Sequence, residues 1–185
     1  MNCIKNTGLD KVTDLLIQNN IVGFFQGRSE AGPRALGNRS LLMSPMKKEN
    51  KDIMNKYKGR ELFRPLAASI LQQEASKWFD MLGLKESPYM MYAVKTLENK
   101  VDLIPAINHV DNTCRIQTLS KDQNPRFYDL IKEFENLTNV PILFNTSFNL
   151  AGDCIVETID DAIHTLKKSK IDCLYVAELG VLIHG

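Results

Sequence analysis

Cysteine is scarce in this sequence, and its cysteines are far apart. No two of them form a Cys-x-x-Cys pair, which argues against a structural zinc site and against a disulfide framework. We therefore expect no metal site built on cysteine, and we expect these side chains to be buried free thiols. The four cysteines are Cys3, Cys114, Cys154 and Cys173.

Long apolar runs and strong net charge are also absent. No run reaches the length needed to cross a bilayer, and the first residues lack the apolar stretch of a signal peptide. The formal net charge is +1 and the pI about 7.6, so the chain as a whole does not attract nucleic acid. We expect a cytoplasmic protein with no membrane partner and no nucleic-acid partner. At 185 residues, residues 1–185 are predicted to form a single domain.

Positive charge is concentrated in one stretch of this nearly neutral chain. Between Arg28 and Arg64 there are ten lysines and arginines against four acidic residues, an excess of six positive charges. The same stretch contains Gly32, Gly37 and Gly59, and Gly27 directly precedes it. Glycine lets a backbone approach a ligand closely, and arginine offers a planar fork of donors that matches phosphate or carboxylate.

A glycine-rich loop carries three of these arginines. Gly-Pro and Leu-Gly steps punctuate the segment 27–40, which predicts turns instead of a helix. Arg28, Arg34 and Arg39 around such turns are predicted to form an anion cradle. The alternative is that they lie on a solvated face or in surface ion pairs.

The hydrophobic pattern predicts alternating helices and strands. This alternation, with some strands adjacent in sequence, indicates an α/β or α+β fold with a mixed sheet flanked by helices. Helices are expected over 9–18, 48–57, 74–81, 125–137 and 159–169, and strands over 21–26, 40–45, 66–71, 87–94, 141–144, 174–176 and 181–183, with a turn leading into a strand over 109–119. The segment 99–107 is expected to be a loop. Thr158 is predicted to cap the helix 159–169, Trp78 to anchor the helix 74–81 in the core, and Met90 and Met91 to lie in the core.

A second polar motif follows the strand predicted at 141–144. Asn145, Ser147 and Asn149 alternate in direction there, and their short side chains can bond phosphate oxygens, ribose hydroxyls or backbone. Such residues are also typical of turns. The motif alone leaves both interpretations open.

Taken together, the motifs resemble one family. They are Glu30-x-Gly-Pro-Arg-Ala-Leu-Gly-x-Arg-Ser40, Lys58-x-Arg60-x-x-Phe-Arg-Pro65, Asp111-x-Thr-x-Arg-x-Gln117 and Phe144-Asn-Thr-Ser-Phe-Asn149. In this order they closely resemble the C-terminal domain of the O-carbamoyltransferases of nodulation-factor and antibiotic biosynthesis. The resemblance runs over nearly the whole chain.

This resemblance implies a fold and a chemistry. The fold would be YrdC-like, as in the enzymes that make threonylcarbamoyl-adenylate. The domain would bind ATP, with magnesium expected alongside it, and would use carbamoyl phosphate to form carbamoyl-adenylate with release of pyrophosphate. The Lys-x-Arg of that fold matches Lys58 and Arg60, and its later Ser/Asn pair matches Asn145 and Ser147, with Asn149 close by.

The resemblance also implies roles for single residues. Lys58 and Arg64 would hold the phosphates and carbamoyl phosphate, Arg34 would neutralise the departing group, and Asn145 with Ser147 would orient the nucleotide. Arg115 would contact ligand or support the loop. Two residues keep alternatives open: Glu30 would hold the loop or serve a metal, and His109 would meet ligand or be structural. No metal ligand is assigned.

Members of the resembled family carry a longer N-terminal actin-like domain that transfers the carbamoyl group. We find no counterpart in residues 1–185, so we expect a separate actin-like transferase subunit as partner. A split gene, a fragment and a degenerate paralogue stay open. The leading hypothesis is the carbamoyl-adenylate-forming half of a carbamoyltransferase. The alternative is a regulatory or docking subunit that binds nucleotide or phosphate without turnover.

Overall fold

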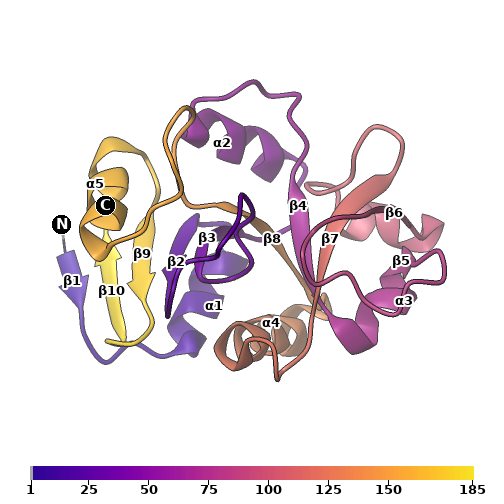
Figure 1. The fold of residues 1–185 in the computed structure, drawn as a ribbon, viewed down its shortest axis with the longest axis horizontal. Coiled ribbons are helices and arrows are strands. Elements are labelled where there is room, and N and C mark those ends of the chain that lie inside the picture. Colours follow the sequence, from indigo (N-terminus) through magenta and orange to yellow (C-terminus); the bar gives the residue numbers. More distant parts are fainter. Residues whose placement is uncertain (1) are drawn as a thin grey trace.

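The structure is a computed structural model that describes residues 2–185, and it contains one mixed ten-stranded sheet (Figure 1). The strand order is β1-β10-β9-β2-β3-β8-β4-β7-β6-β5. The pairs β2/β9 and β4/β7 are parallel, and the other seven pairs are antiparallel. The sequence-based expectation of a mixed sheet with helices is therefore confirmed.

The strands are short at the two edges and longer at the centre. They are β1 (Asn2–Ile4), β2 (Val22–Phe25), β3 (Arg39–Met43), β4 (Ala67–Leu71), β5 (Phe79–Asp80), β6 (Ala93–Thr96), β7 (Thr113–Leu119), β8 (Ile142–Ser147), β9 (Cys173–Val176) and β10 (Val181–His184). The helices are α1 (Leu9–Ile17), α2 (Glu49–Lys58), α3 (Ala75–Trp78), α4 (Pro125–Thr138) and α5 (Ile159–Lys168), with 3-10 turns η1 (Gln72–Glu74) and η2 (Glu98–Leu103).

Local signals explain where the longer helices begin and end. The side chain of Asn124 caps α4, Pro125 occupies its first turn, and Asn139 ends it with a left-handed backbone. Thr158 and Asp161 form a capping box at the start of α5, which confirms Thr158 as the predicted cap. None of the helices within residues 2–185 is long and apolar enough to cross a membrane.

The core lies along the central strands. β2, β3 and β4 are buried at every position, and α4 packs against β4 and β8. Phe24 of β2 packs against Phe127 of α4 and Tyr175 of β9, with ring centroids 5.9 and 5.8 Å away. Trp78 is buried, as predicted for a core anchor. This packing fixes the central strands on which the site is built.

Several predicted elements were wrong in extent. The predicted strand 87–94 forms a strand only from Ala93 onward, as β6. The predicted helix 74–81 is helical only to Trp78, and β5 begins at Phe79. β1 was not predicted, and 99–107 contains most of η2. Met91 was expected in the core but is 72 % exposed. The second polar motif begins on β8 itself, because that strand continues to Ser147.

The cysteines divide into two kinds. Cys114 and Cys173 are buried, and burial raises the pKa of both thiols, that of Cys173 to about 12. Cys3 and Cys154 are exposed free thiols, so the expectation of burial was wrong for them.

Candidate functional site

The loop between β2 and β3 carries Arg34 and is held at its base by side chains. Oε1 of Glu30 accepts hydrogen bonds from the backbone N–H of Leu36 at 2.6 Å and of Asn38 at 2.8 Å. Glu30 thus pins both sides of the loop, which is the structural alternative left open above. Gly37 has φ +106°, and a Cβ there would lie 2.2 Å from the ring of Phe127, so only glycine fits.

Three buried amide side chains hold consecutive carbonyls of the same loop. Asn145 Nδ2 donates to Ala35 O at 3.3 Å, Gln117 Nε2 donates to Leu36 O at 3.0 Å, and Gln26 Nε2 donates to Gly37 O at 2.7 Å. The three amides come from β8, from β7 and from the end of β2. The loop therefore rests on the centre of the sheet, where Figure 1 draws it.

Arg39 is a clamp between backbone segments. Its guanidinium donates to four carbonyl oxygens at 2.6 to 3.2 Å and stacks 3.6 Å over the ring of Phe25. The four oxygens belong to Gln26, Gly27, Asn38 and Glu157. The side chain is 4 % exposed. Its predicted role in ligand binding stays a prediction, since these contacts are all internal.

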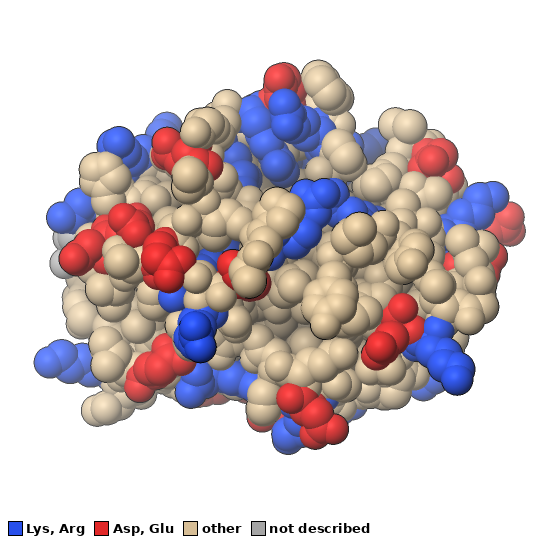
Figure 2. Space-filling model, in the orientation of Figure 1, with Lys and Arg blue, Asp and Glu red and all other residues tan. Residues whose placement is uncertain are grey.

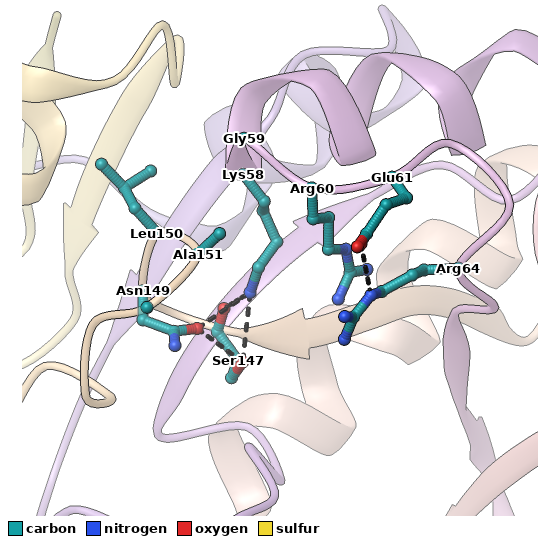
Figure 3. Close-up of a pocket in the computed structure, with 10 residues that line it drawn as sticks. Lys58, Gly59, Arg60, Glu61, Arg64, Ser147, Asn149, Leu150 and Ala151 are labelled. Carbon is teal, nitrogen blue, oxygen red and sulfur yellow. Dashed lines mark hydrogen bonds and ion pairs between the residues drawn. The ribbon is translucent and has the colours of Figure 1, made fainter.

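Lys58 ends α2 and points at the second polar motif, as Figure 3 shows. Its ammonium donates to Ser147 O at 2.6 Å, to Ser147 Oγ at 3.1 Å and to Asn149 Oδ1 at 2.9 Å. All three acceptors are neutral. Burial, with a smaller contribution from the nearby charge of Arg60, lowers the pKa of Lys58 to about 7.

The turn after α2 places Arg60 and Arg64 beside Lys58 (Figure 3). Asn55, which is fully buried, holds this turn: its Nδ2 donates to Leu62 O and Arg64 O, and its Oδ1 accepts from Arg60 Nε at 2.7 Å. Arg64 forms an exposed ion pair with Glu61 at 2.7 Å. Sequence reasoning missed Asn55. The available signal was its place directly after Met54, which is a buried position of this mostly polar helix.

The floor of the site is a row of side chains across three strands. Ala67 of β4 pairs with Arg115 of β7 on one side and with Asn145 of β8 on the other. Side chains at paired positions share a face of the sheet. Ser69 Oγ confirms the shared face, because it bonds Gln117 Oε1 at 2.6 Å and accepts from Asn145 Nδ2 at 2.9 Å. Sequence reasoning gave Ser69, Gln117 and Gln26 no role.

Two cavities are lined by other residues that the sequence assigned to the site. One, of about 580 Å³, is lined by Lys58, Gly59, Arg60, Glu61, Arg64, Ser147, Asn149, Leu150, Ala151 and Gly152. The other, of about 500 Å³, is mostly apolar and lies under the Arg34 loop, with Tyr89 and Met91 in its wall. Of the predicted residues, Lys58, Arg60, Arg64, Ser147 and Asn149 thus share one cavity. Arg34 lines the other. The predicted residues that line neither cavity are Arg28, which is exposed, Arg39, Arg115 and Asn145.

Four of the five cationic side chains of the site lack carboxylate partners, Arg64 being the exception. Within residues 2–185, Lys58, Arg34, Arg60 and Arg115 form no ion pair. Burial lowers the pKa of Arg60, and the charges of Arg64 and Arg115 lower it further. Burial and the charge of Arg34 likewise lower the pKa of Arg115. These mutual effects show one continuous field of positive charge, and Figure 2 shows Lys and Arg side chains gathered over α2 and toward the middle of this face.

Four buried atoms of the site have no hydrogen-bond partner among the described residues. They are two donors, Arg60 Nη2 and Arg115 Nε, and two acceptors, Asn145 Oδ1 and Glu30 Oε2. Unpaired buried donors beside an open cavity fit the phosphate oxygens of a nucleotide. No group of three metal-ligating side chains is present in residues 2–185, so the chain offers Mg²⁺ no cluster of its own. His109 is structural, since its ring contacts Thr113 Oγ1 at 3.1 Å and Leu66 O at 3.4 Å.

Solved structures with the same fold have distant sequences. Full-length HypF in the phosphate- and nucleotide-bound form has a TM-score of 0.64 at 17 % identity, covering 98 % of this chain and 22 % of that one. The P. abyssi Sua5 complexed with L-threonine has a TM-score of 0.63 at 13 % identity, covering 91 % of this chain and 46 % of that one. Both carry the YrdC-like fold, so the expected fold class is confirmed.

Curated relatives are closer in sequence and much longer. The nodulation protein NolO of Bradyrhizobium diazoefficiens is 44 % identical over 165 residues, which cover 88 % of this chain and 30 % of that protein. The chain therefore spans less than a third of that relative. The family model described as "Carbamoyltransferase C-terminus" matches residues 13–182, and it spans all the site residues above. On these grounds the chain belongs to the carbamoyltransferase C-terminus family.

Proposed function

We propose that this chain forms carbamoyl-adenylate from ATP and carbamoyl phosphate, as the activating part of an O-carbamoyltransferase. The observation that carries the proposal is the field of five cations, Lys58, Arg60, Arg64, Arg34 and Arg115, of which only Arg64 has a carboxylate partner within residues 2–185. Such a field, beside unpaired buried donors, suits a ligand with several negative charges.

The chemistry uses fixed positive charge. Carbamoyl phosphate, water and ATP give carbamoyl-adenylate, inorganic phosphate and pyrophosphate. Water first cleaves carbamoyl phosphate to carbamate and inorganic phosphate. A carbamate oxygen then bonds the α-phosphorus of ATP while the bond from that phosphorus to the α,β-bridging oxygen breaks, and pyrophosphate departs with that oxygen. Negative charge accumulates on the phosphoryl oxygens during this step. Lysine and arginine donors held in place stabilise that charge without reorganising.

Each residue then has a role. Lys58 and Arg64 hold the phosphates, and Arg34 neutralises the departing group. Arg60, fixed by Asn55, presents Nη2 to a phosphate oxygen. Ser147 and Asn149 shape the wall around Lys58 and orient the nucleotide. When Mg²⁺ is bound with ATP it supplies further neutralisation of the phosphates.

The relatives support this proposal and extend it. The HypF structure is described as phosphate- and nucleotide-bound, which is consistent with a nucleotide site on this fold. The chain spans about 30 % of NolO, so a further part is needed to transfer the carbamoyl group to an acceptor. We propose that an actin-like transferase part provides it, whether on the same protein or on a partner subunit.

Pyrophosphate release tests the proposal. Purified chain with ATP, Mg²⁺ and carbamoyl phosphate is expected to release pyrophosphate, and a Lys58→Ala/Arg64→Ala double variant is expected to lose it. Lys56→Ala is the matched control, because Lys56 is exposed on the same helix and lines neither cavity. Binding of ATP without any release favours the alternative, a nucleotide-binding docking or regulatory subunit. Full activity in the double variant contradicts the proposal.

A further inference from the structure

Asn55 connects helix α2 to the turn that carries Arg60 and Arg64. Its Nδ2 donates to Leu62 O at 3.0 Å and to Arg64 O at 3.1 Å, and its Oδ1 accepts from Arg60 Nε at 2.7 Å. Both amide hydrogens are used, so turning the amide around would set Oδ1 against two carbonyl oxygens and Nδ2 against an N–H. The side chain is 0 % exposed. The contact between Oδ1 and Arg60 is therefore a fixed feature of the fold.

The two arginines of this turn are held in different ways. Arg64 Nε meets the carboxylate of Glu61 at 2.7 Å, and Arg60 Nε meets the amide oxygen of Asn55 at the same distance. A carboxylate offsets the charge of the arginine that it holds, whereas an amide holds the guanidinium and leaves its charge intact. Arg60 lines the cavity of about 580 Å³, and its buried Nη2 has no partner among residues 2–185. Its charge and one of its donors thus remain available to a ligand.

Asn55 also lies beside Lys58. The two are three residues apart on α2, a spacing that makes side chains neighbours on one face of a helix. Lys58 and Arg60 line the same cavity (Figure 3), and the charge of Arg60 lowers the pKa of Lys58, after the larger effect of burial. The other charged groups that act on Arg60 are Arg64, Arg115 and Glu61. A carboxylate at position 55 would bring a negative charge next to both cations, whereas the amide brings none.

We propose that Asn55 is a positioning residue for the anionic ligand: it fixes Arg60 through a neutral acceptor, so the whole charge of Arg60 remains available to the phosphates. This inference rests on the proposed function, because it takes the cavity beside Lys58 to bind phosphate groups. It adds a requirement at a residue that does not line the cavity. Position 55 needs an amide, and the nearly isosteric carboxylate cannot replace it.

Asn55→Asp tests this requirement, with Asn50→Asp as the matched control. Asn50 is also buried on α2, its Nδ2 also donates to two oxygens, at 2.9 Å each, and it lines neither cavity. Both substitutions remove two hydrogen bonds and add a carboxylate, but only Asn55→Asp sets it against Arg60 Nε. At about pH 6, where Lys58 is charged, affinity for inorganic pyrophosphate should fall at least about tenfold in Asn55→Asp and less than about twofold in Asn50→Asp. Isothermal titration on the whole chain measures both.

The pH profile is a readout that loss of support for the turn does not move. Sulfate is the probe, because its own charge does not change near neutral pH. In wild type, sulfate affinity should fall above about pH 7, as Lys58 loses its proton. A carboxylate near Lys58 favours its charged form, so the fall should begin about one pH unit higher in Asn55→Asp. It should begin at the wild-type pH in Asn50→Asp.

Asn55→Ala separates positioning from charge. It frees the guanidinium of Arg60 without offsetting its charge, so pyrophosphate affinity should lie between those of wild type and Asn55→Asp, and the pH profile should match that of wild type. The alanine sets no oxygen against the carbonyls of Leu62 and Arg64. This variant therefore tests the positioning role even where Asn55→Asp does not fold.

The outcomes distinguish this inference from the proposed function. Wild-type affinity in Asn55→Asp or in Asn55→Ala, or equal losses in Asn55→Asp and Asn50→Asp, overturn the role of Asn55. If wild type then still releases pyrophosphate from ATP and carbamoyl phosphate, the proposed function stands without it. If the affinities follow the expected order but wild type releases no pyrophosphate, Asn55 keeps its role in anion binding and the proposed function fails. If wild type binds neither anion, both fail.

Discussion

The arginines around the site fall into two sets with opposite surroundings. Arg39 makes five hydrogen bonds to four backbone carbonyls and stacks on Phe25, so its donors are used within the fold. Arg60 and Arg115 each keep a buried nitrogen without a partner among residues 2–185. The residue type is the same, and the hydrogen bonds that each side chain makes separate the two sets.

The difference predicts that Arg39 contributes to stability, whereas Arg60 and Arg115 contribute to ligand binding. Donors that are satisfied within the chain contribute to the free energy of unfolding. Buried donors without partners cost free energy in the absence of ligand and recover it when an anion binds. Substitution of Arg39 should therefore reduce stability, and substitution of the cations of the site should reduce ligand affinity. Measurements of both quantities on the same variants test this difference.

The largest effect is expected for Arg39→Met. The change leaves four carbonyls without their charged donor, and we expect a loss of roughly 3–4 kcal/mol in the free energy of unfolding. Urea denaturation followed by circular dichroism measures it. Arg28→Met is the control, since Arg28 is exposed, and its side chain should contribute no more than about 0.5 kcal/mol. A loss below about 1 kcal/mol for Arg39→Met would show that the clamp is dispensable.

Lys58→Met should show the reverse pattern. Removing a buried charge that lacks a carboxylate partner relieves the folded state, while Ser147 and Asn149 lose a donor, so we expect stability to change by no more than about 1 kcal/mol. Affinity for a nonhydrolysable ATP analogue should fall by about 1.5–3 kcal/mol, the value of a charge-assisted contact. Calorimetric titration measures this, with Lys56→Met as control. Unchanged affinity would remove Lys58 from the site.

The lowered pKa of Lys58 predicts a pH dependence of binding. Without ligand the amine is largely neutral above pH 7, because burial lowers its pKa from 10.5 to about 7. A bound anion favours the charged form and raises that pKa, so binding takes up a proton above pH 7. Affinity should then fall as pH rises from 7 to 9, by at most about tenfold per unit.

Titration in buffers of different ionisation enthalpy detects this proton uptake directly. Lys58→Met should abolish the uptake, and a slope that persists in the variant would assign it to another group. Stability should instead rise with pH above 7. The unfolded chain keeps the lysine proton up to about pH 10.5, whereas the folded chain loses it above about pH 7. The cost of burying the charge is therefore fully present below pH 7 and declines above it.

The motif residues of the site were predictable from the sequence because they lie at strand and helix ends. Lys58 ends α2 and Ser147 ends β8, beyond the predicted ends of both elements, so the family resemblance brought them together and the predicted bounds did not. The same reading placed the Arg34 loop after a buried strand. The fold class followed from alternation of helices and strands, and the Thr158 cap from its local pattern.

Long-range pairing could not be predicted in the same way. Arg39 uses its donors within the fold partly because its guanidinium reaches Glu157 O, 118 residues away in the sequence. The row of side chains across the floor depends on the register of β7, β4 and β8. β1 and β5, of three and two residues, exist because neighbouring strands pair with them and not because of their own pattern. Met91 has a core-like side chain, but it lies in the wall of the apolar cavity.

The smallest effect is expected at the ion pair of Arg64 with Glu61. Arg64 has a partner within the chain, as Arg39 has, but it also lines the cavity. Both side chains are about half exposed, at 54 % and 53 %, so Glu61→Gln should change the free energy of unfolding by less than about 0.5 kcal/mol. Because Glu61 competes with an anionic ligand for Arg64, we expect affinity for the ATP analogue to rise about two- to threefold at low salt, and less at high salt.

Glu135→Gln is the control for that measurement, because it removes a comparable ion pair, with Lys132 at 2.6 Å, on α4 away from the cavity. It should leave affinity unchanged. If Glu61→Gln instead weakens binding by more than about threefold, the ion pair holds Arg64 in its binding position. Arg64 would then join Arg39 among the arginines whose partners lie within the chain, and the field of cations that binds the ligand would lose a member.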